Sequence, residues 1–235
     1  DNGGKMSEKS FEGTLGETVS LLIDLGINNN RSWMERNRDR YRIELLEPFR
    51  ALVKQLGPSM ERIDPFIDVR PQVGKTISRI SRDARRNKGK PPYRTNMWFT
   101  FRVPGPDWKD SPGFFFELFP DWYRYGMGFY LPSRATMVKL SEEIEKNPVR
   151  FVEKTKVLRD REFSVFGEKY KRRRNRKGVS DSLSEWLQYK DFYIASNHEI
   201  DEILLSSRLV GHLEAAFSAL SELYEYFWEL KMRDA

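Results

Sequence analysis

The sequence lacks cysteine altogether and contains only two histidines, His198 and His212. Without thiolates the chain cannot form disulfides, thiolate zinc sites, iron–sulfur clusters or a cysteine nucleophile. Two imidazoles are too few for a site that takes several histidine ligands from one chain. We therefore expect no metal and no cofactor, and the lack of cysteine favours a reducing compartment, the cytoplasm.

Long hydrophobic runs are also absent, because charged residues interrupt every apolar segment before it reaches the roughly eighteen residues of a membrane-spanning helix. We therefore expect no membrane partner. Residues 1–10 are polar and glycine-rich, and we expect them to be a disordered tail or a cloning remnant. Apolar residues recur along the rest of the chain, which predicts a single domain over residues 11–235.

Charge is plentiful but unevenly distributed. The chain has a formal net charge of +6, yet residues 79–94 hold seven basic residues against one acid, and residues 169–177 hold seven against none. The rest of the chain is net acidic. If the fold brings the two basic segments together, they form a positive face that attracts anions.

The hydrophobic spacing predicts an α+β fold, with an N-terminal helical pair, a central, mostly antiparallel sheet of about five strands, and C-terminal helices packed on one face. The first helix is expected over residues 14–25, and the second begins at Asn30, is kinked by Pro48 and ends at Gly57 and Pro58. Strands are expected at 66–69, 76–80, 97–103, 114–119, 125–130 and 192–195. Further helices are expected from Ser133, from Asn147 to Val157, over 181–188 and over 209–227.

Residues 79–96 carry a family resemblance. They read RISRDARRNKGKPPYRTN, and their informative positions are Arg79, Arg82, Asp83, Arg85, Lys90, Tyr93 and Asn96. This pattern resembles the signature of a bacterial family of uncharacterised proteins, domain of unknown function 2461, although Arg86 replaces a Phe of that signature and Gly89 replaces an Asp or Asn. The resemblance extends to the Asn29, Asn30 and Trp33 turn and to residues 125–130 and 167–171. It implies a shared fold and a bacterial source, without an established activity.

Three arginines around one aspartate suit recognition of phosphate or carboxylate, because each guanidinium presents paired donors to two oxygens. We expect a binding module for nucleic acid or a phosphorylated small molecule. Its ligand-binding residues would be Arg79, Arg82, Arg85, Lys90, Tyr93 and Asn96. One alternative is an internal ion-pair network among Arg79, Arg82, Asp83 and Arg85. Another is an enzyme acting on a phosphorylated or carboxylated metabolite, with Asp83 or Tyr93 as acid or base.

Strand alternation suggests a second part of the binding site. It places Trp98 on one face of its strand, and a neighbouring strand carries Gly126 and Gly128 two residues apart. Two glycines on one face leave a groove in which a ligand or a base could lie against Trp98. The alternative is that the glycines serve close packing or a bulge.

Two further segments suggest partners. Lys171, Arg172, Arg173 and Arg174 resemble a strip that contacts a phosphate backbone, with a solvated loop as the alternative. Residues 209–228 carry an apolar stripe at about 3.5-residue spacing, so a scaffold that self-associates through this helix is a third functional alternative.

Overall fold

One five-stranded sheet lies at the centre of the computed structural model, which describes residues 14–83, 85, 89–172 and 180–233. The strands are β1 (Met97–Arg102), β2 (Pro112–Leu118), β3 (Trp122–Phe129), β4 (Ser164–Phe166) and β5 (Tyr193–Glu199). Their order is β1-β2-β3-β5-β4, and every pair is antiparallel. The predicted α+β class and the antiparallel sheet of five strands are confirmed.

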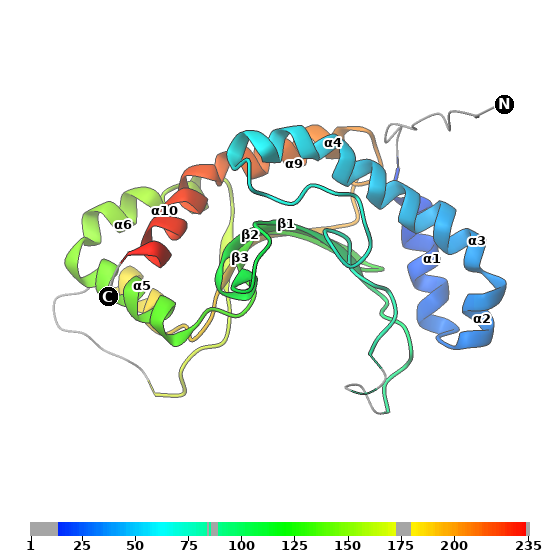
Figure 1. Ribbon diagram of the computed structural model, residues 1–235, viewed down its shortest axis with the longest axis horizontal. Coiled ribbons are helices and arrows are strands. Elements are labelled where there is room, and N and C mark those ends of the chain that lie inside the picture. The colour runs from blue at the N-terminus through cyan, green and yellow to red at the C-terminus, as the bar shows by residue number, and fades with distance from the viewer. Residues whose placement is uncertain (1–13, 84, 86–88, 173–179, 234–235) are drawn as a thin grey trace.

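Helices cover one face of the sheet and flank it at both ends (Figure 1). The N-terminal group comprises α1 (Gly16–Ile27), α2 (Arg31–Arg36), α3 (Arg38–Arg40), a π-helical turn at Tyr41–Leu46 and α4 (Glu47–Ile63). The others are α5 (Arg134–Lys146), α6 (Pro148–Lys154), α7 (Val157–Asp160), α8 (Asp181–Trp186), α9 (Arg208–Ala219) and α10 (Ser221–Met232). α4 and α9 lie above the arched sheet, while the underside of the arch faces away from them (Figure 1).

Strand alternation separates the two faces of the sheet. On the helix-covered face, Phe99 pairs with Phe116, which in turn pairs with Tyr125, and all three side chains are buried. On the other face, the side chains of Trp98 and Phe115 are only partly buried. The core therefore lies between the sheet and the helices, and the second face is available to a ligand.

Two predicted strands do not form. Residues 66–69 are a loop in which the Phe66 side chain is 74% exposed, so its aromatic character did not indicate burial. Residues 76–80 make only isolated bridges, in which Ile77 pairs with Val73 and with Phe99. The strand prediction missed β4, because three residues are too short for an alternating pattern to be recognised.

Two predicted helix ends were also wrong. α4 continues through Gly57 and Pro58 to Ile63, because Leu56 and Met60 on either side of them are fully buried and hold the helix against the core. The expected C-terminal helix is divided at Leu220 into α9 and α10. The apolar stripe of residues 209–228 packs into the core of this chain, so its side chains are not on the surface.

Two glycines let neighbouring strands approach closely. A Cβ atom on Gly126 would lie 1.9 Å from the carbonyl oxygen of Ile194, and one on Gly128 would lie 2.6 Å from the Cα of Tyr193. Both contacts are with β5, on the open face of the sheet. Close packing, the alternative role considered for these glycines, is therefore what the structure shows at Gly126.

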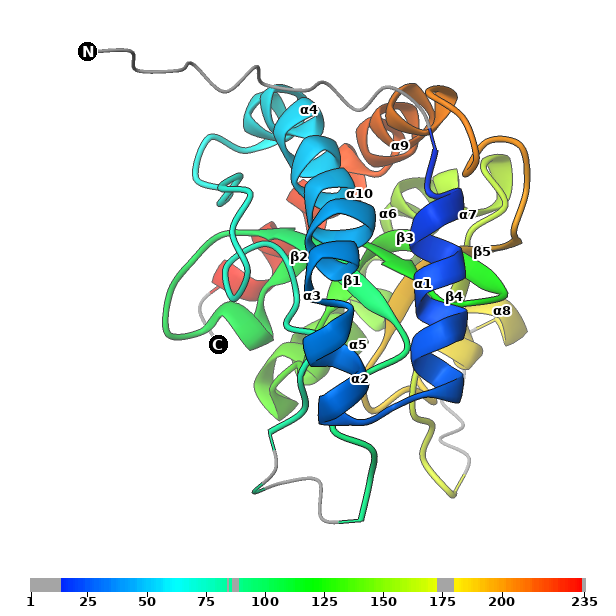
Figure 2. The same ribbon diagram turned by 90° about the vertical axis from the view of Figure 1, so that its right-hand side faces the viewer.

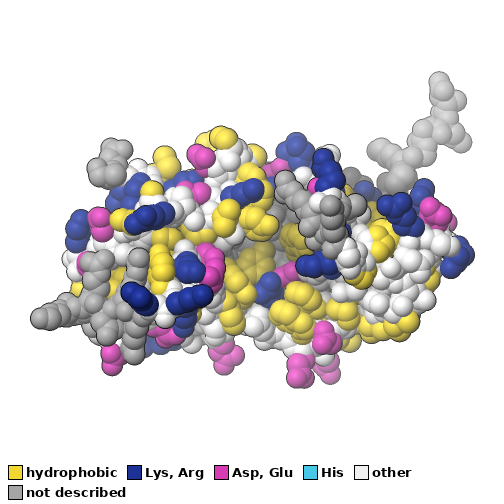
Figure 3. Space-filling model, turned by 90° about the horizontal axis from the view of Figure 1, so that it is seen from below, with side chains coloured by type: hydrophobic (Ala, Val, Ile, Leu, Met, Phe, Trp, Pro, Cys, Tyr) yellow, Lys and Arg dark blue, Asp and Glu magenta, His cyan; other side chains and the backbone are white. Residues whose placement is uncertain are grey.

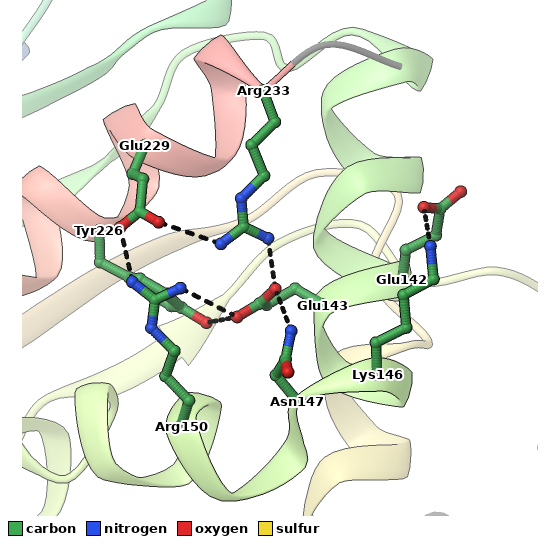
Figure 4. A network of polar contacts seen from close by, with 8 residues as sticks. All are labelled: Glu142, Glu143, Lys146, Asn147, Arg150, Tyr226, Glu229 and Arg233. Carbon is green, nitrogen blue, oxygen red and sulfur yellow. Dashed lines mark hydrogen bonds and ion pairs between the residues drawn. The ribbon is translucent and has the colours of Figure 1, made fainter.

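A polar network fixes the C-terminal helices to one another (Figure 4). Glu143 of α5 is only 2% exposed and accepts hydrogen bonds from the Tyr226 hydroxyl, at 2.8 Å, and from Asn147 Nδ2, at 3.0 Å. Arg233 also donates to Glu143, and Arg150 lies 3.7 Å from it. Burial alone would raise the pKa of Glu143, but the hydrogen bonds outweigh burial and lower it below its usual value.

We expect Gly126→Ala to lower the free energy of unfolding by about 1–3 kcal/mol, because the new methyl group overlaps the backbone of β5. Gly211→Ala in α9 is the matched control, since its Cβ would meet nothing within 4 Å and alanine favours a helix by about 1 kcal/mol. Urea unfolding of both variants measures the difference. Equal stabilities would contradict the close approach of β3 and β5.

We expect Glu143→Gln to lower the free energy of unfolding at neutral pH by about 1.5–3 kcal/mol, because it removes the charge that Arg233 and Arg150 face. Since the folded-state pKa of Glu143 is lowered, its contribution is complete above the unfolded pKa and disappears as the pH falls through the folded pKa.

The stability difference between wild type and Glu143→Gln should therefore shrink in urea titrations below about pH 4. Glu142→Gln is the control, because Glu142 is exposed and its pair with Lys146 is worth about 0.5 kcal/mol or less. A difference that stays constant down to acid pH would show that the charge of Glu143 contributes nothing.

Candidate functional site

A groove of about 600 Å³ occupies the open face of the sheet. Four arginines line it, together with a single carboxylate among the described residues and seven aromatic residues, of which Phe114 and Phe129 belong to the buried face of the sheet. The arginines are Arg82, Arg94, Arg102 and Arg124, the other aromatics are Trp98, Trp108, Phe115, Tyr130 and Tyr193, and the carboxylate is Glu117. Figure 3 shows this face as a hollow with hydrophobic side chains at its base and Lys and Arg side chains on both sides.

β1 and the residues before it supply one wall. Arg94, Asn96, Trp98, Thr100 and Arg102 all line the groove, and they recur at every second position. Because a strand turns alternate side chains to opposite faces, this spacing is what directs all five to the open face. At about 3.3 Å per residue the row extends over roughly 26 Å, with an arginine at each end and a tryptophan in the middle.

The first basic segment folds back on itself before it enters β1. Ser81 and Tyr93 form an antiparallel bridge, and backbone hydrogen bonds join Arg82 N to Pro92 O at 2.8 Å and Arg94 N to Ile80 O at 2.8 Å. Arg82 and Arg94 flank the Ser81–Tyr93 pair, so their side chains project to the same side. This pairing brings two guanidinium groups from opposite arms into one groove.

The N-terminal helical pair holds this basic hairpin in place. Asn29, in the turn between α1 and α2, donates from Nδ2 to the carbonyl oxygen of Tyr93 and accepts through Oδ1 from the Tyr93 amide, both at 3.0 Å. The next residue, Asn30, caps α2 by accepting from Trp33 N, as its sequence position predicted. Asn29 therefore serves the position of the hairpin, and Asn30 serves the helix.

Arg82 and Arg94 form a like-charged pair. Among the described residues, no carboxylate lies within ion-pair distance of either guanidinium. Arg82 Nε donates to the Tyr93 carbonyl at 3.1 Å, and Arg94 Nη1 donates to the carbonyls of Arg79 and Ser81 at 3.0 and 2.8 Å. Burial and then the charge of Arg82 lower the pKa of Arg94. An anion placed between them would relieve this repulsion.

Arg102, at the other end of the row, lies over an aromatic ring. Its Cζ is 3.7 Å from the centre of the Trp108 ring, a cation–π contact. In the described part of the chain no hydrogen-bond acceptor is within reach of this guanidinium. Burial lowers the pKa of Arg102, and the nearby charge of Asp68 partly offsets the effect of burial. Arg102 therefore keeps its donors for a ligand.

The guanidinium group of Arg124 is already engaged in hydrogen bonds within the protein. Its Nε donates to Glu117 Oε2 at 2.7 Å, and its Nη1 donates to the Tyr193 hydroxyl at 2.7 Å. Asn96 Nδ2 donates to the other oxygen of Glu117 at 2.6 Å. This cluster fixes the middle of the groove, and its hydrogen bonds hold Glu117 away from Arg82, Arg94 and Arg102.

Several predicted site residues lie outside the groove. Arg85 is at the tip of the hairpin, where its Nε is 3.1 Å from Asp83 Oδ1 and its side chain is 89% exposed. Arg79 lies with its guanidinium over Gly74, and Lys90 is exposed. Tyr93 packs against the core. The structure therefore brings Arg82, Asn96 and Trp98 together, and it does not bring the three arginines of the signature into one site.

The remaining predicted contacts divide in the same way. Gly128 lines the groove, whereas Gly126 does not. Their strand, β3, is not next to β1, because β2 lies between them. Lys171 and Arg172 are exposed, and Arg173 and Arg174 lie outside the described residues.

The two histidines meet on the opposite face of the sheet, where His212 of α9 lies against His198 of β5. The Tyr125 hydroxyl lies 2.7 Å from His212 Nε2 and 3.0 Å from His198 Nε2, and Ser196 Oγ is 2.9 Å from His198 Nε2. Burial lowers the pKa of both histidines. Both rings pack against Tyr125.

Sequence reasoning missed Arg94 and Arg124 as site residues. Arg94 was counted only as part of a basic segment, although its two-residue spacing from Asn96 and Trp98 was a usable signal. Arg124 had the same signal in the alternation of β3, where buried Tyr123 and Tyr125 flank it.

Two kinds of feature are absent from the described residues. No helix there is long and apolar enough to cross a bilayer. No three or more His, Asp or Glu side chains are grouped there so that they could bind a metal ion.

Comparison with known proteins places the chain in a family. No curated protein matched it. The family model described as conserved hypothetical protein (DUF2461) matches residues 17–226, which include the helical pair, the hairpin and all five strands. The chain therefore belongs to this family, domain of unknown function 2461.

Proposed function

We propose that this protein is an anion-binding module whose site is the groove on the open face of the sheet. The observation that carries the proposal is the pair formed by Arg82 and Arg94, which line the groove without a carboxylate opposite them in the described part of the chain. Guanidinium groups suit phosphate oxygens, because each presents paired donors in a plane.

The rest of the groove favours a ligand with a phosphate and a flat portion. Trp98 lies between the two arginine-bearing ends of the row, and Arg94 lies 5.4 Å from the centre of its ring. A planar group could lie against Trp98 while its phosphate is held by Arg82 and Arg94. The groove favours binding over catalysis, because Glu117, its only acid among the described residues, is held by Arg124 and Asn96.

We expect adenosine triphosphate to bind the protein and neutral adenosine to bind much more weakly, as measured by isothermal titration calorimetry. Arg102→Gln and Arg94→Gln should each weaken binding of the triphosphate about tenfold or more, the effect of losing one charged hydrogen bond. Arg102→Gln is the cleaner variant, because Arg94 also holds the carbonyls of the hairpin.

The matched control is Arg208→Gln, which removes the same charge from an exposed side chain at the start of α9. It should leave the affinity for the triphosphate almost unchanged. If the groove variants and the control lose affinity equally, the effect is one of net charge, and the groove is not the site. Absence of triphosphate binding by the wild-type protein would reject the proposal.

A further inference from the structure

Resting on the proposed function, we infer that the groove binds single-stranded nucleic acid, which lies across the strands from one edge of the sheet to the other. The two basic segments adjoin the two edge strands of the sheet. Residues 79–94 lead into β1 and residues 169–177 follow β4, and these strands are at opposite ends of the sheet order. The groove lies between them.

The described residues of the two segments project to the same side of the sheet. Their described parts extend below it in two perpendicular views, one beside each edge of the open face (Figures 1 and 2). Arg82 and Arg94 belong to the first segment and line the groove. Lys171 and Arg172, in the second, are exposed. Positive charge is therefore present at both edges of the sheet, inside the groove at the β1 edge and beyond the groove residues at the β4 edge, and this distribution suits a chain of phosphates.

The span between the edges exceeds the reach of one phosphate group. Five strands are separated by four intervals of about 4.8 Å, or roughly 19 Å in all. At the stacked spacing of about 3.4 Å per nucleotide, about six nucleotides cover this distance. A single phosphorylated metabolite would contact one edge only.

The floor between the edges is aromatic. Trp98 of β1, Phe115 of β2 and Tyr193 of β5 all line the groove, so three strands each offer a ring on the open face. Bases stack on such rings whatever their identity, and only unpaired bases can reach rings at the base of a hollow. This arrangement favours a single strand over a duplex.

Fluorescence anisotropy with labelled oligothymidylates tests the inference. We expect affinity to increase with length up to about six nucleotides and then to level off. Affinity should fall steeply with added salt, and Trp98→Ala should weaken binding about tenfold or more, while Trp98→Phe restores most of it. Arg172→Glu should weaken binding of the longer strands more than the charge-matched control Arg208→Glu.

The remaining outcomes separate this inference from the proposed function. If adenosine triphosphate binds and oligothymidylate affinity does not increase with length, the nucleic-acid inference is wrong and a small phosphorylated ligand is favoured. If inorganic polyphosphate or duplex DNA binds as tightly as the single strand, charge alone accounts for binding, and the inference is again wrong. If neither the triphosphate nor any oligonucleotide binds, the proposed function fails as well.

Discussion

The close approach of β3 and β5 at Gly126 and Gly128 is the constraint that makes the open face of the sheet different from the helix-covered face. Side chains at these positions would collide with the backbone of β5, so glycine is required for the strands to approach on the open side. Large rings fill the opposite side, where Phe99, Phe116 and Tyr125 are buried. The groove lies on the face where the two glycines leave room beside the partly buried rings of Trp98 and Phe115.

Some arginines of this chain are paired with carboxylates, and others are held by backbone carbonyls or an aromatic ring. Around Glu143, the charges of Arg150 and Arg233 are offset by carboxylates, and the result is a tie between helices (Figure 4). In the groove, Arg94 is held by backbone carbonyls and Arg102 by an aromatic ring, which fix the positions of the groups without cancelling their charge. With 35 acidic residues in the sequence, the chain does not lack carboxylates. The contrast distinguishes arginines that stabilise the fold from arginines that are available to a ligand.

Sequence patterns predicted the class of the fold better than the composition of the site. Alternation identified the strands that carry Phe99, Phe116 and Tyr125, because burial on one face imposes a two-residue period. The same pattern wrongly predicted a strand at Phe66, because the sequence does not distinguish an exposed aromatic residue from a buried one. At Pro58, packing of the residues on either side overrode a local signal for helix termination.

The site was only partly predictable because it is built across the sheet. Arg82 and Trp98, predicted as binding residues from adjacent segments of sequence, both line the groove, whereas Arg124 reaches the groove only through the pairing of β1, β2 and β3. Local clustering of charge was a poor guide, since Arg85, two residues after Asp83 in the signature, is 89% exposed and lies outside the groove. Neighbours in sequence along a hairpin alternate between its two sides, so only some of a basic run can serve one pocket.

The double contact between Asn29 and the backbone of Tyr93 spans 64 positions of the sequence. The Asn29 amide forms the pair of hydrogen bonds that a residue of a neighbouring β-strand would form with the Tyr93 backbone. Tyr93 itself does not line the groove. The turn between α1 and α2 therefore helps to orient Arg82 and Arg94, because it holds the hairpin that carries them. Without that turn, the rings of the groove would remain in place as part of the sheet, whereas the hairpin that carries Arg82 and Arg94 would lose its contact with the helices.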